Sequence, residues 1–235
     1  MSNTNILYQH GTLALLVPGL LDGTITMKEL LTHGDTGIGT GEGLDGELVI
    51  LDGKPYQVDH RGQVNLVDDN FTLPFANIHW ADYHKLTSVE NIEQADLEKK
   101  ILSLTSANTF FSIKLHGEFS YAQTRAVKRS SKPYDTLAKT AASQSIFEQK
   151  DITGTLLSYY SPEIFDGAAV GGFHHHFLSD QRDFGGHLLS FKSATGDVEL
   201  QQFDTLEQHL PTKNKPYMDF DFSGHDILGD IHKSE

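Results

Sequence analysis

Short runs of alternating apolar and polar residues, separated by turn residues, make up most of the chain. Two Asp-Gly pairs flank the apolar run within Leu44 to Tyr56, which predicts two strands joined by a tight turn. Apolar residues spaced three and four apart predict one longer helix within Ile92 to Leu104. Shorter helices are expected after the capping-box sequence that begins at Thr26, and near Tyr134 to Phe147.

Strand patterns dominate the second half of the chain. Phe110 to Leu115 and Phe119 to Val127 are expected to form a strand pair around His116-Gly117. Further strands are expected at Thr155 to Tyr160, Val170 to Leu178, His187 to Phe191 and Val198 to Phe203. Because helices only interrupt the strand runs, the pattern predicts an α+β fold with mixed, largely antiparallel β-sheets and a few flanking helices.

The domain organisation is only weakly marked in the sequence. We expect two intimately packed subdomains, a β-rich one over residues 1–150 and a second one over residues 151–235. The segment from Lys150 to Gly154 is the candidate boundary, and a single domain is the alternative.

Composition narrows the possible partners and the compartment. The net charge of −14 repels phosphate backbones, so nucleic acid is not expected as a partner. The apolar run from Leu13 to Leu21 contains Pro18 and Gly19, is too short to span a bilayer and lacks the marks of a secretory signal. We therefore expect a cytoplasmic protein without a membrane partner.

Alternating glycines between Gly37 and Gly43 are similar to a phosphate-binding loop. Such a loop requires a helix directly after it, whereas the residues that follow predict a strand. The sequence therefore does not support a nucleotide site.

The stretch from Gly171 to His187 carries the most informative chemistry. On a strand, His174 and His176 point to one face and His175 points to the other, where we expect it to have a structural role. A polar, Gly-ended loop follows, and His187 then opens the returning strand. A hairpin can thus bring a third imidazole to the face that already holds two.

Three imidazoles with an open fourth position are typical of a catalytic zinc site. Since the chain has no cysteine, any transition metal must be bound by histidine and carboxylate side chains. The alternative is that these are surface histidines, or core histidines bonded to the backbone. The remaining histidines show no comparable arrangement: His10, His33, His60, His79, His84, His116, His209, His225 and His232.

Two charged residues are candidates to join this site. Glu47 alternates with Val49 and Leu51 on one strand face, where a carboxylate is costly to bury unless it meets a cation or hydrogen-bond donors. Arg125 shares a face with aromatic residues, and its planar fork matches a carboxylate group. An ordinary ion pair or a solvated strand residue is the alternative for each of them.

The stretch from Gly171 to His187, taken together with the glycine-rich and Asp-Gly segments described above, closely resembles the α-acetolactate decarboxylase family. The most specific block is Gly172-Phe173-His174-x-His176-Phe177 with Gly185-Gly186-His187. Other matching segments occur in consistent order from about Thr12 to about Phe203: Gly34 to Thr40, Leu44 to Leu48, Leu51 to Gly53, and Leu73 to Ala76. The segment Leu157 to Pro162 departs from the family pattern at Tyr159-Tyr160, which bears on the shape of the substrate pocket.

The resemblance implies a set of site residues. His174, His176 and His187 would bind zinc, and Thr40, Glu47 and Arg125 would surround the metal. A glutamate near the C-terminus of the family corresponds loosely to Glu235, with Asp230 as a possible substitute. Which carboxylate delivers the proton stays open at this point.

The resemblance also implies the reaction, which is decarboxylation of 2-acetolactate to acetoin and CO2 through a metal-stabilised enediolate. It implies zinc, no organic cofactor, a homodimer and a place on the branch toward 2,3-butanediol. Two alternatives stand beside it: another lyase or hydrolase with three metal-binding histidines, or a β-domain that binds metal or a small molecule without catalysis.

Overall fold

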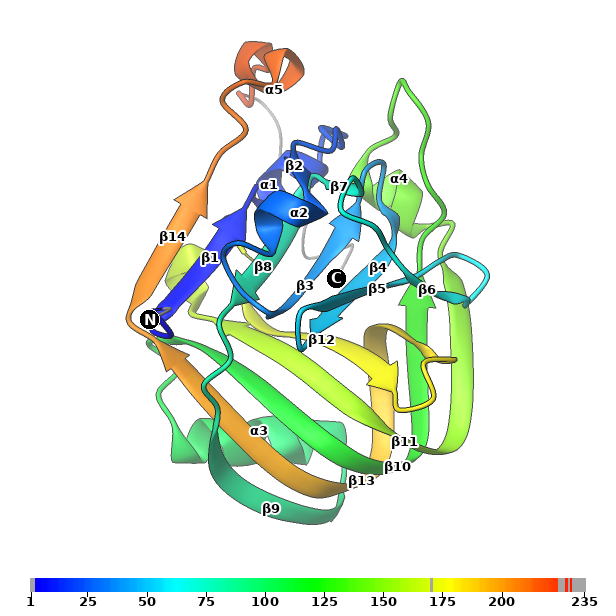
Figure 1. The fold of residues 1–235 in the computed structure, drawn as a ribbon, viewed down its shortest axis with the longest axis vertical. Coiled ribbons are helices and arrows are strands. Elements are labelled where there is room, and N and C mark those ends of the chain that lie inside the picture. The colour runs from blue at the N-terminus through cyan, green and yellow to red at the C-terminus, as the bar shows by residue number, and fades with distance from the viewer. Residues whose placement is uncertain (1–2, 170, 224–226, 228, 230–235) are drawn as a thin grey trace.

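The computed structural model describes residues 3–169, 171–223, 227 and 229, and two β-sheets form most of it (Figure 1). The first sheet has seven strands, and all neighbours are antiparallel except β1 and β14. In spatial order its strands are β14 (Thr205–His209), β1 (Ile6–His10), β8 (Phe75–His79), β3 (Thr36–Gly41), β4 (Asp45–Leu51), β5 (Lys54–Val58) and β6 (Val64–Leu66). The predicted hairpin in Leu44 to Tyr56 is confirmed, because β4 and β5 meet at Asp52-Gly53 with positive φ at both residues.

The second sheet is antiparallel throughout and is built from long, curved strands. They are β10 (Phe110–Ala126), β11 (Ser145–Ser161), β12 (Gly172–Ser179), β13 (Gly185–Phe203) and β9 (His84–Ile92). Strand β10 pairs with both β11 and β13, and β12 pairs with the same two strands, so these four strands close a ring. A third, small sheet joins β2 (Ile25–Thr26) to β7 (Thr72–Leu73).

Helices are short and flank the sheets. They are α1 (Leu13–Leu16), α2 (Met27–Leu30), α3 (Gln94–Leu104), α4 (Leu137–Ala141), α5 (Lys215–Asp219) and one 3-10 turn, η1 (Glu163–Phe165). The capping pattern at Thr26 is confirmed, since its hydroxyl accepts a hydrogen bond from the Glu29 N–H. No helix in the described part of the chain is both long and apolar enough to cross a membrane.

The apolar core has one layer between the two sheets, one outside each sheet, and a fourth cluster where α1 packs against α4. Strand β4 shows how its alternating residues divide: Val49 and Leu51 pack toward the second sheet, while Leu48 and Ile50 pack toward α2 and β2. On the outer side of the second sheet, Leu97 and Ile101 of α3 cover its long strands. The α+β fold with largely antiparallel sheets is confirmed.

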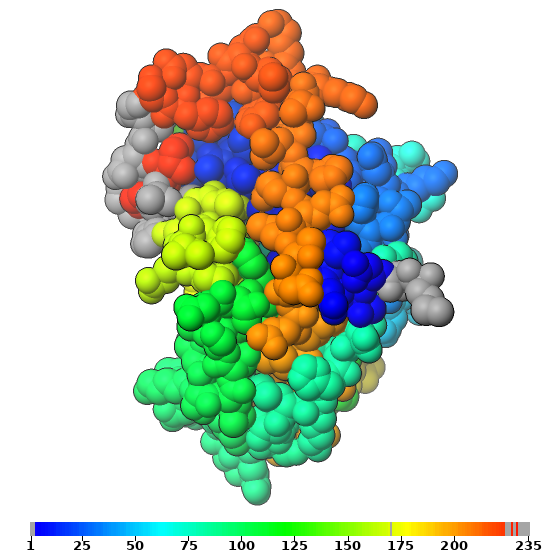
Figure 2. Space-filling model, turned by 90° about the vertical axis from the view of Figure 1, so that its left-hand side faces the viewer, coloured from blue at the N-terminus to red at the C-terminus, as the bar shows by residue number. Residues whose placement is uncertain are grey.

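The first and the last strand of the chain, β1 and β14, lie side by side. Strand β1 pairs in parallel with β14, from Ile6 opposite Thr205 to His10 opposite His209. Figure 2 shows this side of the molecule, with the N-terminal residues in blue beside β14 in orange.

The predicted break at His116-Gly117 is wrong, because β10 runs through it as one strand of 17 residues. Gly117 lies opposite Gly154 of β11 and Gly196 of β13. A Cβ on Gly117 would lie 2.0 Å from the Thr195 carbonyl oxygen, so glycine serves the close approach of curved strands here rather than a turn.

Two further expectations differ from the structure in extent. The helix expected near Tyr134 to Phe147 is only the five-residue α4, and Ser145 already begins β11. The candidate boundary at Lys150 to Gly154 falls inside β11, and the division into residues 1–150 and 151–235 stays a prediction.

Candidate metal centre

The hairpin of β12 and β13 brings three imidazoles together. His174 and His176 lie on one face of β12, and His176 is directly opposite His187 in the ladder. One ring nitrogen from each of the three lies within 4.8 Å of the others. The His174 Nε2 and the His187 Nδ1 are 3.1 Å apart.

His175 lies on the opposite face of β12, as the strand alternation predicts. Its Nε2 is 3.1 Å from the Glu98 Oε1 of α3, and its ring stacks on Phe173. This contact links the back of the hairpin to the helix that covers the second sheet.

His176 has its two ring nitrogens in different surroundings. Its Nδ1–H donates to the Leu48 carbonyl oxygen of β4 at 2.9 Å, which places the lone pair on Nε2. The Nε2 is buried and has no hydrogen-bond partner among the described residues. A buried acceptor of this kind, beside two more imidazoles, fits a divalent metal ion.

The three imidazoles are neutral. Burial lowers the pKa of His174 to about 3, and it lowers the pKa of both His176 and His187 well below the ordinary value. The positive charge of Arg125 lowers all three pKa values further. Neutral imidazole is the form that binds a metal ion, so at pH 7 no proton has to leave before binding.

Arg125 is placed beside the histidines by strand pairing. In β10 it lies directly opposite His187 of β13, and only 8% of its surface is exposed. Its Nη1 donates to the Gln144 Oε1 at 3.0 Å. A buried guanidinium at this position can bind an anionic group next to a metal ion.

Glu47 and Thr40 come from the first sheet. They are cross-strand partners in β4 and β3, and both are at least 92% buried. The Glu47 Oε2 lies 3.6 Å from the His176 Nε2, while the Thr40 hydroxyl donates to the Gly46 carbonyl oxygen at 2.7 Å. The inward orientation predicted for Glu47 therefore brings its carboxylate to the imidazoles.

One cavity between the sheets is lined by all six of these polar side chains. The other residues that line the cavity are mainly apolar and were not predicted as site residues: Leu13, Leu16, Gly39, Leu44, Phe75, Val127, Leu137 and Ala141. Gly39, Leu44 and Phe75 lie in segments that resemble the family, whereas α1 and α4 are distant in sequence and carry no motif. The cavity thus has a polar half with the imidazoles and an apolar half.

Two remaining expectations concern other parts of the chain. Glu235 and Asp230 lie outside the described residues. The departure at Tyr159-Tyr160 lies away from the cavity lining. Tyr159 donates to the Thr36 carbonyl oxygen between the sheets, and Tyr160 stacks on Phe111, so both residues belong to the core.

Comparison with known proteins gives consistent results. The sequence model of the alpha-acetolactate decarboxylase family matches residues 7–224. Alpha-acetolactate decarboxylase from Streptococcus thermophilus is 36% identical over 100% of both chains. The protein of that name from Methanosarcina mazei is 37% identical, over 91% of this chain and 75% of its own.

Solved structures agree with the sequence comparison. A Staphylococcus aureus protein, described as of unknown function and similar to alpha-acetolactate decarboxylase, has a TM-score of 0.95 at 35% identity, covering 98% of this chain and 100% of that one. For alpha-acetolactate decarboxylase from Bacillus subtilis the TM-score is 0.92 at 29% identity, covering 98% and 99%. This chain therefore belongs to the alpha-acetolactate decarboxylase family.

Proposed function

We propose that this protein decarboxylates 2-acetolactate to acetoin and CO2, with a zinc ion bound by His174, His176 and His187. The names of its relatives supply the substrate. The observation that carries the proposal is the cavity, in which three neutral imidazoles lie beside the carboxylate of Glu47 and the guanidinium of Arg125. When bound, zinc would act as a Lewis acid that lowers the cost of negative charge on the substrate oxygens.

Arg125 is proposed to bind the substrate carboxylate through two parallel N–H donors. This binding orients the carbon–carbon bond that breaks, so that its electron pair can enter the neighbouring ketone as CO2 leaves. The apolar half of the cavity receives the methyl groups and excludes water, which strengthens the electrostatic interactions inside.

Glu47 is proposed to deliver the one proton that the reaction consumes. Loss of CO2 leaves an enediolate, and protonation of one carbon gives acetoin. Because Glu47 is held on the inward face of β4, it can protonate from one side only and so produce one enantiomer. Glu235 is the second candidate for this role.

The homodimer, the cytoplasmic location and the place on a branch toward 2,3-butanediol remain proposals of the same kind. These proposals rest on family membership, and the chemistry proposed for the cavity does not depend on them.

The direct test is to incubate the purified, zinc-loaded protein with racemic 2-acetolactate and to measure acetoin and CO2. We expect one acetoin per CO2 and predominantly one acetoin enantiomer. Dialysis against a chelator should remove the activity, and added zinc should restore it. A binding domain without catalysis would bind zinc in the same experiment but would form acetoin no faster than buffer does.

A second expected result concerns Arg125. Arg125→Lys keeps the charge but loses the two-pronged geometry, so turnover should fall by up to about 100-fold, the cost of misplacing a substrate by roughly 1 Å. Bound zinc should stay at the wild-type level, because Arg125 is not a proposed ligand. Arg61→Lys, in the exposed turn before β6, is the matched control. An unchanged turnover in Arg125→Lys would contradict the proposed role.

A further inference from the structure

The outer wall of the cavity comes from a segment that leaves the second sheet. This segment, residues 127–144 between β10 and β11, is called the strap below. Its residues Val127, Leu137 and Ala141 line the apolar half of the cavity. Its last residue, Gln144, accepts the hydrogen bond from Arg125. The position of the strap therefore affects both the size of the cavity and the orientation of Arg125.

Part of the strap is held by apolar packing and backbone contacts. Leu137 packs against α1, and its N–H donates to the Val17 carbonyl oxygen at 3.1 Å. The Ser130 N–H donates to the Gly43 carbonyl oxygen at 2.7 Å. The stretch from Lys128 to Pro133 is largely exposed, so packing contributes little there.

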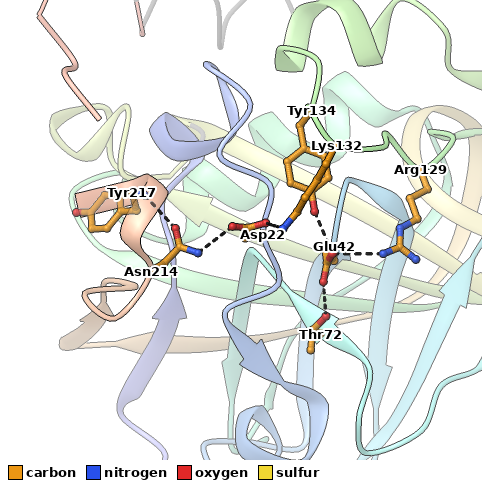
Figure 3. A network of polar contacts seen from close by, with 8 residues as sticks. All are labelled: Asp22, Glu42, Thr72, Arg129, Lys132, Tyr134, Asn214 and Tyr217. Atoms are coloured by element: carbon orange, nitrogen blue, oxygen red, sulfur yellow. Dashed lines mark hydrogen bonds and ion pairs between the residues drawn. The ribbon is translucent and has the colours of Figure 1, made fainter. Parts of the chain in front are cut away.

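Polar side chains hold this exposed stretch (Figure 3). The Glu42 Oε1 accepts from the Tyr134 hydroxyl at 2.9 Å and lies 3.3 Å from the Arg129 Nη2. The Glu42 Oε2 accepts from the Thr72 hydroxyl at 3.0 Å, which ties the same carboxylate to β7. Beside it, the Lys132 Nζ lies 2.6 Å from the Asp22 Oδ1.

Glu42 is well suited to this task. Burial alone raises its pKa, but the hydrogen bonds from Tyr134 and Thr72 and the charge of Arg129 outweigh burial and lower it below the ordinary value. The group is therefore ionised at pH 7 and binds its donors strongly. Glu42 follows β3 directly and lies two residues after Thr40, yet it does not line the cavity.

We propose that Glu42 is a positioning residue, which holds the strap over the cavity through Tyr134 and Arg129 and so determines how large a substrate the apolar half accepts. The inference about substrate size rests on the proposed function. The attachment of the strap does not, because it follows from contacts outside the cavity.

The test uses the zinc-loaded protein and the variant Glu42→Gln. An amide cannot accept from both Tyr134 and Arg129 with the strength of a carboxylate, so the strap should open more often. We expect the KM for 2-acetolactate to rise about tenfold with a small change in kcat, as for the loss of one charged hydrogen bond. The preference for 2-acetolactate over its homologue with an ethyl group in place of the 2-methyl group should also decrease.

Limited trypsin digestion provides a readout that is independent of activity. Opening of the strap exposes the peptide bonds after Lys128 and Arg129, and cleavage tracks the population of the open form. In Glu42→Gln, cleavage at these bonds should be roughly tenfold faster, as identified by mass spectrometry. Tyr134→Phe removes one of the donors and should reproduce part of the effect, and this variant carries the test if Glu42→Gln does not fold.

The matched control is Glu199→Gln. Glu199 is a half-buried carboxylate of β13 that pairs with Lys114 at 2.8 Å and does not line the cavity. The Glu199→Gln variant loses the same negative charge as Glu42→Gln, and its KM and its rate of trypsin cleavage in the strap should stay at wild-type values. Wild-type cleavage of the strap in both Glu42→Gln and Tyr134→Phe would overturn the proposal. If wild type does not convert 2-acetolactate at all, the proposed function fails while the digestion still tests the strap.

Discussion

His176→Ala is expected to empty the metal site and to abolish turnover. Even changing the groups that orient a metal ligand costs about 10–100-fold in metal affinity, so removal of a ligand should cost more. Among the three proposed ligands, His176 has a backbone contact, from its Nδ1 to the Leu48 carbonyl oxygen, that directs the lone pair of its Nε2. The measurement is zinc content after dialysis, together with acetoin formation and circular dichroism to confirm folding.

His175→Ala is the internal control for this experiment. His175 is adjacent in sequence, equally part of β12, and directed to the other face against Glu98. It should keep zinc content and turnover near wild type, although the loss of the Glu98 contact can lower stability. In the wild type we expect zinc–nitrogen distances of roughly 2.0–2.1 Å. Retention of zinc in His176→Ala, with loss in His175→Ala, would reject the proposed ligand set.

Glu47→Gln should lower kcat by about 10²–10⁴-fold, the usual contribution of general acid–base catalysis. Glutamine keeps the size and hydrogen-bonding capacity of the side chain but cannot deliver a carboxylic proton. Zinc content should be unchanged, because the three imidazoles remain. Steady-state kinetics and zinc analysis on the same preparation separate loss of the acid from loss of the metal.

The stereochemistry of acetoin decides between the two candidate acids. We expect a variant that ends before Asp230 to lose activity if a carboxylate of this tail contributes. Glu47→Gln should form acetoin of lower enantiomeric purity, because protonation is then no longer directed to one face of the enediolate. If enantiomeric purity is lost in the truncated variant and kept in Glu47→Gln, proton delivery belongs to a carboxylate of the tail, either Asp230 or Glu235. Glu118→Gln, an exchange in the middle of β10 outside the cavity lining, is the matched control for Glu47→Gln.

The parts of the site that depend on local geometry could be predicted from the order of residues along the chain. A strand has a period of two residues, so the spacing of His174 and His176 places both on one face without further information. The same alternation directs Glu47 inward with Val49 and Leu51. The Asp-Gly turn and the Thr26 cap were also predictable, because the residues that determine each of them are neighbours in the chain.

The meeting of distant segments at the site could not be predicted in this way and is known from the folded structure alone. Arg125 reaches the imidazoles because β10 is continuous and pairs with β13 in a ring of strands. The pairing register of these strands depends on glycines that allow close backbone contact. The neighbouring residues in the sequence do not distinguish this role from that of a turn. The apolar wall comes from α1 and α4, which are separated by more than a hundred residues. Such contacts depend on the global packing of the two sheets, and neither helix carries a local pattern that encodes them.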